Sequence, residues 1–245
     1  MVSRCRFQSS SEVGAYARIT NSYAILPSTN TDNFFQSFES ILSDKIPIIH
    51  SSIAGTPIVG RLVVGNKNGL IVPLTTTTIE IDSIRANLPE SIEIAKIEER
   101  FSALGNVISC NDHFALVHPE LDEDTLETLE RVLGVEVIKT KIAEESLVGS
   151  YSVMTNKGCI VTPKATPEEI ESLSKMLDIT VEAATVNRGI QYISAGVCVN
   201  DFALFCGYDC TALEIANLTR IFKIDDSYHE NTDLVNIDDS FVSLL

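Results

Sequence analysis

Arg61-Leu-Val-Val-Gly-Asn66-Lys-Asn-Gly69-Leu-Ile-Val-Pro73 is the stretch that decides the fold, because its pattern returns along the whole 245-residue chain. Residues 151–163 read Tyr-Ser-Val-Met-Thr-Asn-Lys-Gly-Cys-Ile-Val-Thr-Pro and repeat it. Both segments are two short β-rich runs around an Asn/Gly turn, which is typical of a β-hairpin. The second run ends at a proline, which cannot continue a central strand.

The turn asparagine recurs at intervals of 45, 45, 45 and 44 residues, at Asn21, Asn66, Asn111, Asn156 and Asn200. A glycine opens the apolar run before each one: Gly14, Gly60, Gly105, Gly149 and Gly196. A fixed period of this length indicates one supersecondary unit repeated five times. We therefore predict that the asparagines share one turn position, with a structural role, and that the glycines share another.

A helical pattern and then a third strand follow each hairpin. Thr166 is a predicted N-cap, with Pro167 in the first turn and apolar residues at helical spacing behind it. The predicted unit is therefore β-β-α-β. The units cover about residues 10–53, 54–98, 99–142, 143–188 and 189–224.

The fifth unit lacks a third strand of its own. Residues 4–8 precede Gly14 much as the other third strands precede their glycines, so we expect this N-terminal strand to complete the last unit and close the ring. The sequence thus predicts one α/β domain over residues 1–224, a five-bladed β/α propeller with pseudo-five-fold symmetry. Residues 225–245 are acidic and are predicted to be a flexible tail.

Composition narrows the range of partners. The chain carries 34 acidic and 18 basic residues, a net charge of −16, which argues against nucleic acid as the main partner and suits a basic protein surface. The N-terminus has no signal-peptide core, and no apolar run is long enough to span a membrane. The six cysteines form no CxxC pair, which favours reduced, buried thiols and no zinc site. We expect a monomer without cofactor or metal.

The chain resembles the translation initiation factor six family of eukaryotes and archaea. The resemblance rests on the order and spacing of segments 53–56, 60–61, 65–70, 98–106, 110–112, 115–119, 148–151, 186–189 and 199–201. It covers roughly residues 1–224 and implies a five-bladed propeller of the pentein type, the same architecture that the repeat predicts.

The resemblance also implies a function. Members of this family bind the intersubunit face of the large (60S) ribosomal subunit, mainly through large-subunit ribosomal protein fourteen, near the sarcin–ricin loop. They block joining to the small (40S) subunit and accompany large-subunit precursors out of the nucleolus. A GTPase with its cofactor protein releases them. The implied location is the cytoplasm, nucleus and nucleolus.

Candidate contact residues follow the repeated glycine. Arg61 and Asn106 come directly after it and match the family's motif residues, so we expect them on the ribosome-facing rim. The same position is predicted to hold Ala15, Ser150 and Val197 in the other units. Tyr151, beside Ser150, is a candidate aromatic contact, although a core tyrosine fits its position as well. Ser174, which has Glu171 on the same helix, is a possible phosphorylation site.

The rival hypothesis is an enzyme. The pentein fold also hosts guanidine-modifying hydrolases and amidinotransferases, which use a Cys nucleophile with His and carboxylate partners. His118 and Glu120 form a His-x-acid pair, but the repeat accounts for His118 because Val72 and Thr162 fill the same position. Cys206 and Cys210 have no clear partner, so the sequence predicts no catalytic residues.

Overall fold

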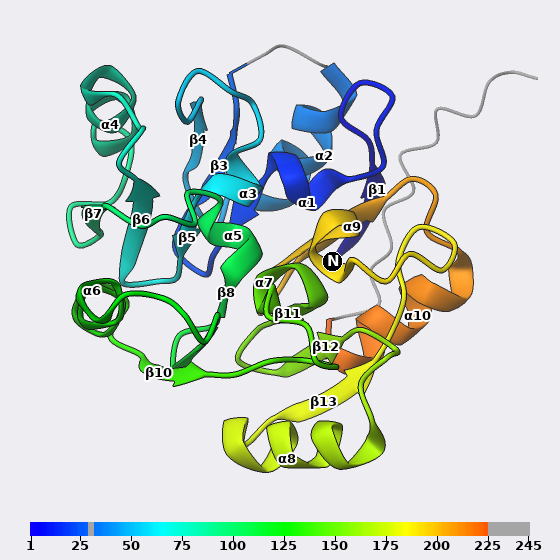
Figure 1. The fold of residues 1–245 in the computed structure, drawn as a ribbon. Coiled ribbons are helices and arrows are strands. Elements are labelled where there is room, and N and C mark those ends of the chain that lie inside the picture. The colour runs from blue at the N-terminus through cyan, green and yellow to red at the C-terminus, as the bar shows by residue number, and fades with distance from the viewer. Residues whose placement is uncertain (29–31, 225–245) are drawn as a thin grey trace, which may run out of the picture.

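A computed structural model describes residues 1–28 and 32–224. Five three-stranded sheets surround a central axis, with one ring of short helices near the axis and longer helices on the outside (Figure 1). In each sheet the inner strand pairs antiparallel with the middle strand, and the third strand runs parallel to the middle one. The predicted five-bladed α/β propeller of the pentein type, with pseudo-five-fold symmetry, is confirmed.

Unit by unit, the strands are β2 (Arg18–Ile19), β3 (Ala24–Pro27) and β4 (Ile48–Ser51); β5 (Val64–Gly65), β6 (Gly69–Pro73) and β7 (Glu93–Ile97); β8 (Ile108–Cys110), β9 (Phe114–Val117) and β10 (Glu136–Lys139); β11 (Ser152–Met154), β12 (Gly158–Val161) and β13 (Thr180–Ala183); β14 (Val197–Val199) and β15 (Leu204–Gly207). The outer helices are α2 (Asp32–Leu42), α4 (Thr78–Arg85), α6 (Glu123–Leu133), α8 (Pro167–Leu177) and α10 (Ala212–Ile221).

The N-terminal strand closes the ring as predicted. β1 (Val2–Cys5) pairs parallel with β15, from Val2 opposite Leu204 to Cys5 opposite Gly207. Its predicted bounds, residues 4–8, were wrong. The register with β15 ends at Cys5, and Phe7 instead makes an isolated bridge to Ser10, which turns the chain toward the first unit.

Each unit also begins with a four-residue helix that the sequence did not predict. These short helices are α1 (Val13–Tyr16), α3 (Val59–Leu62), α5 (Leu104–Val107), α7 (Val148–Tyr151) and α9 (Ile193–Gly196). Each contacts the next, and α9 contacts α1. A Cβ on Gly60 would lie 2.2 Å from the Gly14 carbonyl oxygen, and one on Gly105 would lie 2.4 Å from that of Gly60. Glycine is therefore required for this approach, and the unit is α-β-β-α-β.

Cap chemistry explains where the outer helices begin. Thr166 caps α8 by accepting a hydrogen bond from the Glu169 N–H, and the Glu169 carboxylate accepts one from the Thr166 N–H. The same capping box opens α4 and α10. Gly134 ends α6 with φ of 64°, a left-handed conformation that glycine adopts without strain.

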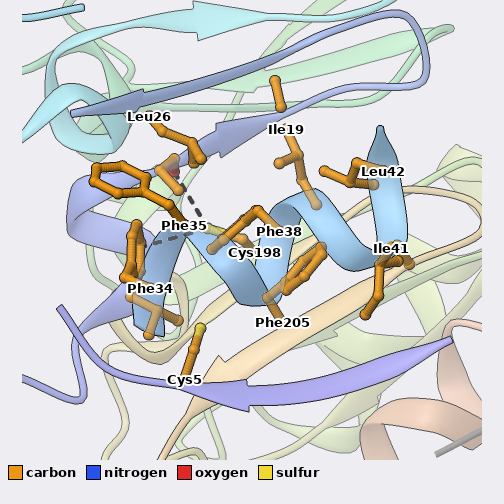
Figure 2. Close-up of a cluster of buried hydrophobic side chains, with 14 of the residues drawn as sticks. Cys5, Ile19, Leu26, Phe34, Phe35, Phe38, Ile41, Leu42, Cys198 and Phe205 are labelled. Atoms are coloured by element: carbon orange, nitrogen blue, oxygen red, sulfur yellow. Dashed lines mark hydrogen bonds between the residues drawn. The ribbon is translucent and has the colours of Figure 1, made fainter. Parts of the chain in front are cut away.

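The hydrophobic core lies in the seams between adjacent units, because each cluster of buried side chains draws on two neighbouring blades. At the closing seam, Phe34 and Phe38 of α2 pack over β1 and β15 (Figure 2). The rings of Phe38 and Phe205 stack with centroids 3.9 Å apart. Burying aromatic surface between the first and last units holds the ring closed without a covalent link.

Two further predictions bear on the rest of the chain. The acidic tail, residues 225–245, lies outside the described residues, so its flexibility stays a prediction. Within the described ranges, no helix combines the length and apolar character needed to cross a bilayer.

Candidate functional site at the short-helix end of the ring

The five short helices lie together at one end of the ring axis, which we call the short-helix end. In all five units the N–H of the third helix residue bonds to the carbonyl three residues before it, which places Ala15, Arg61, Asn106, Ser150 and Ala195 in one structural position. The prediction of Val197 as the fifth member was wrong. Unit five has Ser194, not Gly196, at the glycine position, so the residue that follows it is Ala195. A Cβ on Gly14 would meet the Ser194 carbonyl, just as one on Gly60 would meet that of Gly14.

Arg61 and Asn106 are brought together, as neighbours around the ring. The Arg61 Nη1 donates to Asn106 Oδ1 at 3.1 Å and to Ser194 Oγ at 2.7 Å. Burial lowers the pKa of Arg61. The negative charge of Glu12 raises this pKa, and the positive charge of Arg18 lowers it. No ion pair to a described residue involves Arg61. Its guanidinium is thus oriented through one nitrogen and keeps other donors for an incoming group.

Ser150 and Tyr151 lie at the same end but are buried, with 6% and 5% of their surface exposed. The Tyr151 ring packs on that of Tyr192, with centroids 5.3 Å apart, and burial raises the Tyr151 pKa to about 12. Tyr192 is 54% exposed and covers it. The accessible aromatic here is therefore Tyr192, which the sequence reading missed because it lies in another unit.

Behind this end, a cavity of about 60 Å³ lies on the ring axis. Glycines and serines from the short helices and inner strands line it, together with Arg18 at the start of β2. Arg18 donates from Nη2 to the carbonyls of Gly60 and Val63, both at 3.0 Å. No sequence motif pointed to Arg18, since its partners come from the next unit of the repeat.

The hairpin turns meet at the opposite end, which we call the hairpin-turn end. Asn21 and Asn156 each donate from Nδ2 to Asp112 Oδ2 and Asp201 Oδ2, at 2.6–2.8 Å. Asp112 Oδ1 accepts from the Lys67 N–H, and Asp201 Oδ1 from the Asn156 N–H. This network ties all five units together around the axis.

The prediction that the five asparagines share one turn position was wrong. Turn geometry makes Asn66, Asn111 and Asn200 equivalent to Thr20 and Thr155, since each of these five N–H groups bonds to the carbonyl three residues ahead. Asn21 and Asn156 stand one position later, beside Lys67, Asp112 and Asp201. Threonine replaces asparagine because its hydroxyl also accepts turn N–H groups, as Thr20 does from Ser22 and Tyr23.

Most of the cysteine thiols are buried. Burial raises the pKa of Cys110 to about 11 and those of Cys159 and Cys198 to about 12. Cys210 differs: a hydrogen bond from Cys206 lowers its pKa, although the side chain is buried. His118 Nδ1 accepts from the Glu120 N–H, a local turn contact. Across residues 1–28 and 32–224, no three His, Cys, Asp or Glu residues gather as metal ligands.

Ser174 lies on α8, away from both ends. Its hydroxyl donates to the Ile179 carbonyl at 2.6 Å, and the side chain is half-buried. Glu171 pairs with Lys175 at 2.6 Å rather than with Ser174. Phosphorylation of Ser174 would break the Ile179 bond; it stays a prediction.

The architecture defines a five-bladed propeller whose two axial ends carry different polar chemistry. A family model described as the eIF-6 family matches residues 2–221. The chain belongs to this family, and its role is that of a translation initiation factor.

Relatives of similar length support this assignment. The chain is 47% identical over 227 residues to eukaryotic translation initiation factor 6-2 of Arabidopsis thaliana, covering 93% of each. It is 44% identical over 231 residues to eukaryotic translation initiation factor 6 of Saccharomyces cerevisiae, covering 94% of each. Among solved structures, the arginine dihydrolase ArgZ of Cyanobacteria matches with a TM-score of 0.47 and 11% identity, over 70% of this chain and 28% of that one.

Proposed function

We propose that this protein binds the large (60S) ribosomal subunit at its intersubunit face, using the short-helix end of the ring, and thereby prevents premature joining of the 40S subunit. The observation that carries the proposal is the Arg61 guanidinium, held by Asn106 and Ser194 and without an ion pair among the described residues. An oriented, partly desolvated arginine is a common centre of binding energy at an interface.

Exposed apolar side chains accompany the short helices. Ile58, Leu147 and Tyr192 are N-caps of three of the short helices, and all three are exposed large hydrophobic residues. Apolar residues that gather at one end of a soluble protein favour an interaction surface. Aromatic and arginine anchors among apolar residues are typical of the centre of such a surface.

Charge supports a ribosomal protein as the direct partner. With a net charge of −16, the chain as a whole is repelled by bare rRNA and attracted to a basic protein. The family resemblance implies large-subunit ribosomal protein fourteen, near the sarcin–ricin loop, as this partner, and the acidic charge of the chain is consistent with it. Anti-association would then be steric: a protein of 26.8 kDa bound to the intersubunit face excludes the 40S subunit without a chemical step.

The remaining parts of the proposal concern the cellular cycle. A monomer would accompany 60S precursors from the nucleolus and nucleus to the cytoplasm, and a GTPase with its cofactor protein would release it from the mature subunit. Phosphorylation at Ser174 would be a separate regulatory input.

We also propose that the protein is not an enzyme. A guanidine-modifying pentein needs a reactive thiolate, whereas burial raises the pKa of Cys159 and Cys198 to about 12. Cys210, the thiol whose pKa is lowered, is 2% exposed and bonds to Asn187. Selective labelling of one cysteine by a haloacetamidine would favour the enzyme instead; uniform inertness supports a binding protein.

Sedimentation of the pure protein with separated subunits tests the function. We expect it to pellet with 60S but not with 40S subunits and to suppress joining. Arg61→Leu and Asn106→Ser should weaken 60S binding about tenfold or more, a loss of about 1.4 kcal/mol, while the melting temperature stays nearly unchanged.

Matched controls lie on the outer helix α4 and the residues just after it. Arg85→Leu and Asn87→Ser make the same chemical changes at exposed positions away from the axis. They should bind as the wild type does. If the wild type binds neither subunit, the function is wrong. If it binds but Arg61→Leu and Asn106→Ser bind equally well, the docking face is wrong.

A further inference from the structure

The axial cavity behind Arg61 contains an unusual cation. Of the described residues that line the cavity, Arg18 is the only charged one. The others are mainly glycines, apolar residues and serines drawn from all five units. An arginine in such a place loses much of its hydration, so its charge needs a counter-charge or a full set of acceptors.

Arg18 has neither within the described chain. Nη2 uses both of its bonds on the carbonyls of Gly60 and Val63. Nε is buried and has no hydrogen-bond partner in the described structure. No carboxylate of the described residues lies within 4.0 Å of Arg18. One side of the guanidinium is therefore left without an acceptor.

A second cation borders the same mouth of the cavity. Ser194 lines the cavity and accepts a hydrogen bond from Arg61 at 2.7 Å. The positive charge of Arg18 lowers the pKa of Arg61 and the Glu12 carboxylate raises it, and no described acid lies within salt-bridge distance of either arginine. Two guanidinium groups beside one cavity favour an anion there.

Hydroxyl donors complete the lining. The Ser109 hydroxyl makes no hydrogen bond to a described residue, and the Ser194 hydroxyl accepts from Arg61 and keeps its own proton to donate. A buried water needs about 10–15 Å³ of the same kind of space. A cavity of about 60 Å³ therefore has room for a small polyatomic ion.

We propose that the axial cavity is a binding site for one small oxyanion, of the phosphate or carboxylate class, held by Arg18 and by the hydroxyls of Ser109 and Ser194. The ion supplies an acceptor and a counter-charge that Arg18 lacks within the described chain. Its source is either free solute or an acidic group carried by a docking partner.

Isothermal titration and thermal melting of the full chain test the proposal, with sodium phosphate and sodium acetate as probes. Sodium chloride at matched ionic strength is the blank. We expect saturable one-site binding of at least one probe, with a melting temperature that rises to a plateau. Saturation by phosphate alone indicates a free tetrahedral ion. Saturation by acetate as well indicates that a partner's carboxylate can occupy the site.

Arg18→Met should weaken this binding at least tenfold, whereas Arg85→Met, an exposed control on α4, should leave it unchanged. If Arg18→Met does not fold, Arg18→Lys serves instead. It keeps the charge, but its three donors radiate from one nitrogen and cannot reproduce the planar fork that spans the two carbonyls and an anion, so at least tenfold weakening is again expected.

Crystals grown with selenate give a direct second readout, because selenium scatters anomalously. The expected peak lies within hydrogen-bond distance of Arg18. Three results would each overturn the proposal: no saturable effect of either probe on the wild type beyond the chloride blank, full binding by Arg18→Lys, or a selenate peak only elsewhere. None of these readouts depends on ribosome binding.

Discussion

The two ends of the ring axis are built from the same repeated unit, yet they use polar groups in opposite ways. At the hairpin-turn end, two aspartates and two asparagines satisfy one another across the axis. At the short-helix end, Arg61 is oriented through one nitrogen, and Arg18 Nε has no partner among the described residues. The first arrangement closes the ring, whereas the second leaves donors for something outside the chain.

The odd number of blades explains why the polar network at the hairpin-turn end is not symmetric. In a ring with an even number of units, amide and carboxylate side chains could alternate at every position. With five units, one position has no place in the alternation. Lys67 occupies it and contributes its backbone N–H to Asp112 instead of a side chain. The difference between the ends thus arises from single residues at equivalent positions, while the repeated backbone stays the same.

The largest effect is expected from removing one aspartate of the network at the hairpin-turn end. Asp201→Ala removes the acceptor of the Asn156 N–H and one acceptor from each of the Asn21 and Asn156 amides. Bonds to a charged acceptor contribute about 1.5–3 kcal/mol, so we expect a loss of about 2–3 kcal/mol, after some relief of repulsion from Asp112. Urea denaturation measures the change.

Asp209→Ala is the matched control, because Asp209 is exposed and accepts one bond from Ser11. It should change stability by less than about 0.5 kcal/mol. An Asp201→Ala protein as stable as this control would show that the network does not close the ring. If Asp201→Ala is fully stable but no longer binds 60S subunits, the docking surface lies at the hairpin-turn end and the proposed short-helix end is wrong.

These two ends also mark what a sequence can and cannot reveal. The 45-residue period correctly predicted five hairpin units, the outer helices and the closing N-terminal strand. It failed on register, because Thr20 and Thr155 fill the turn position through a hydroxyl while Asn21 and Asn156 stand one residue later. A repeat shows which positions correspond, but not which side chains from different blades meet. Ser194 and Arg18 were therefore missed, since their partners lie in other units.

At the short-helix end, a double-mutant cycle tests whether Asn106 contributes to 60S binding through Arg61. Asn106 and Ser194 hold Arg61 and are expected to act through it. If Arg61→Leu costs about 1.4 kcal/mol or more of 60S binding, adding Asn106→Ser should cost less than about 0.5 kcal/mol further. Quantitative sedimentation of the four proteins measures the coupling. Fully additive losses would mean that Asn106 contacts the subunit independently of Arg61.

The last prediction concerns Glu80 at the start of the outer helix α4, whose carboxylate binds the loop that precedes α3. Burial alone would raise its pKa, but hydrogen bonds from the Ser52 hydroxyl, the Gly55 N–H and Thr77 lower it from 4.5 to about 2. A lowered carboxyl pKa stabilises the fold above pH 4.5, and this contribution is lost as the pH falls toward 2.

Glu80→Gln should therefore cost about 1 kcal/mol at neutral pH, and its deficit against the wild type should shrink as the pH falls from 4.5 toward 2. Denaturation at a series of pH values measures this convergence. Glu90→Gln, an exposed control, should follow the wild type throughout. A deficit that stays constant with pH would mean that Glu80 acts by packing rather than by charge.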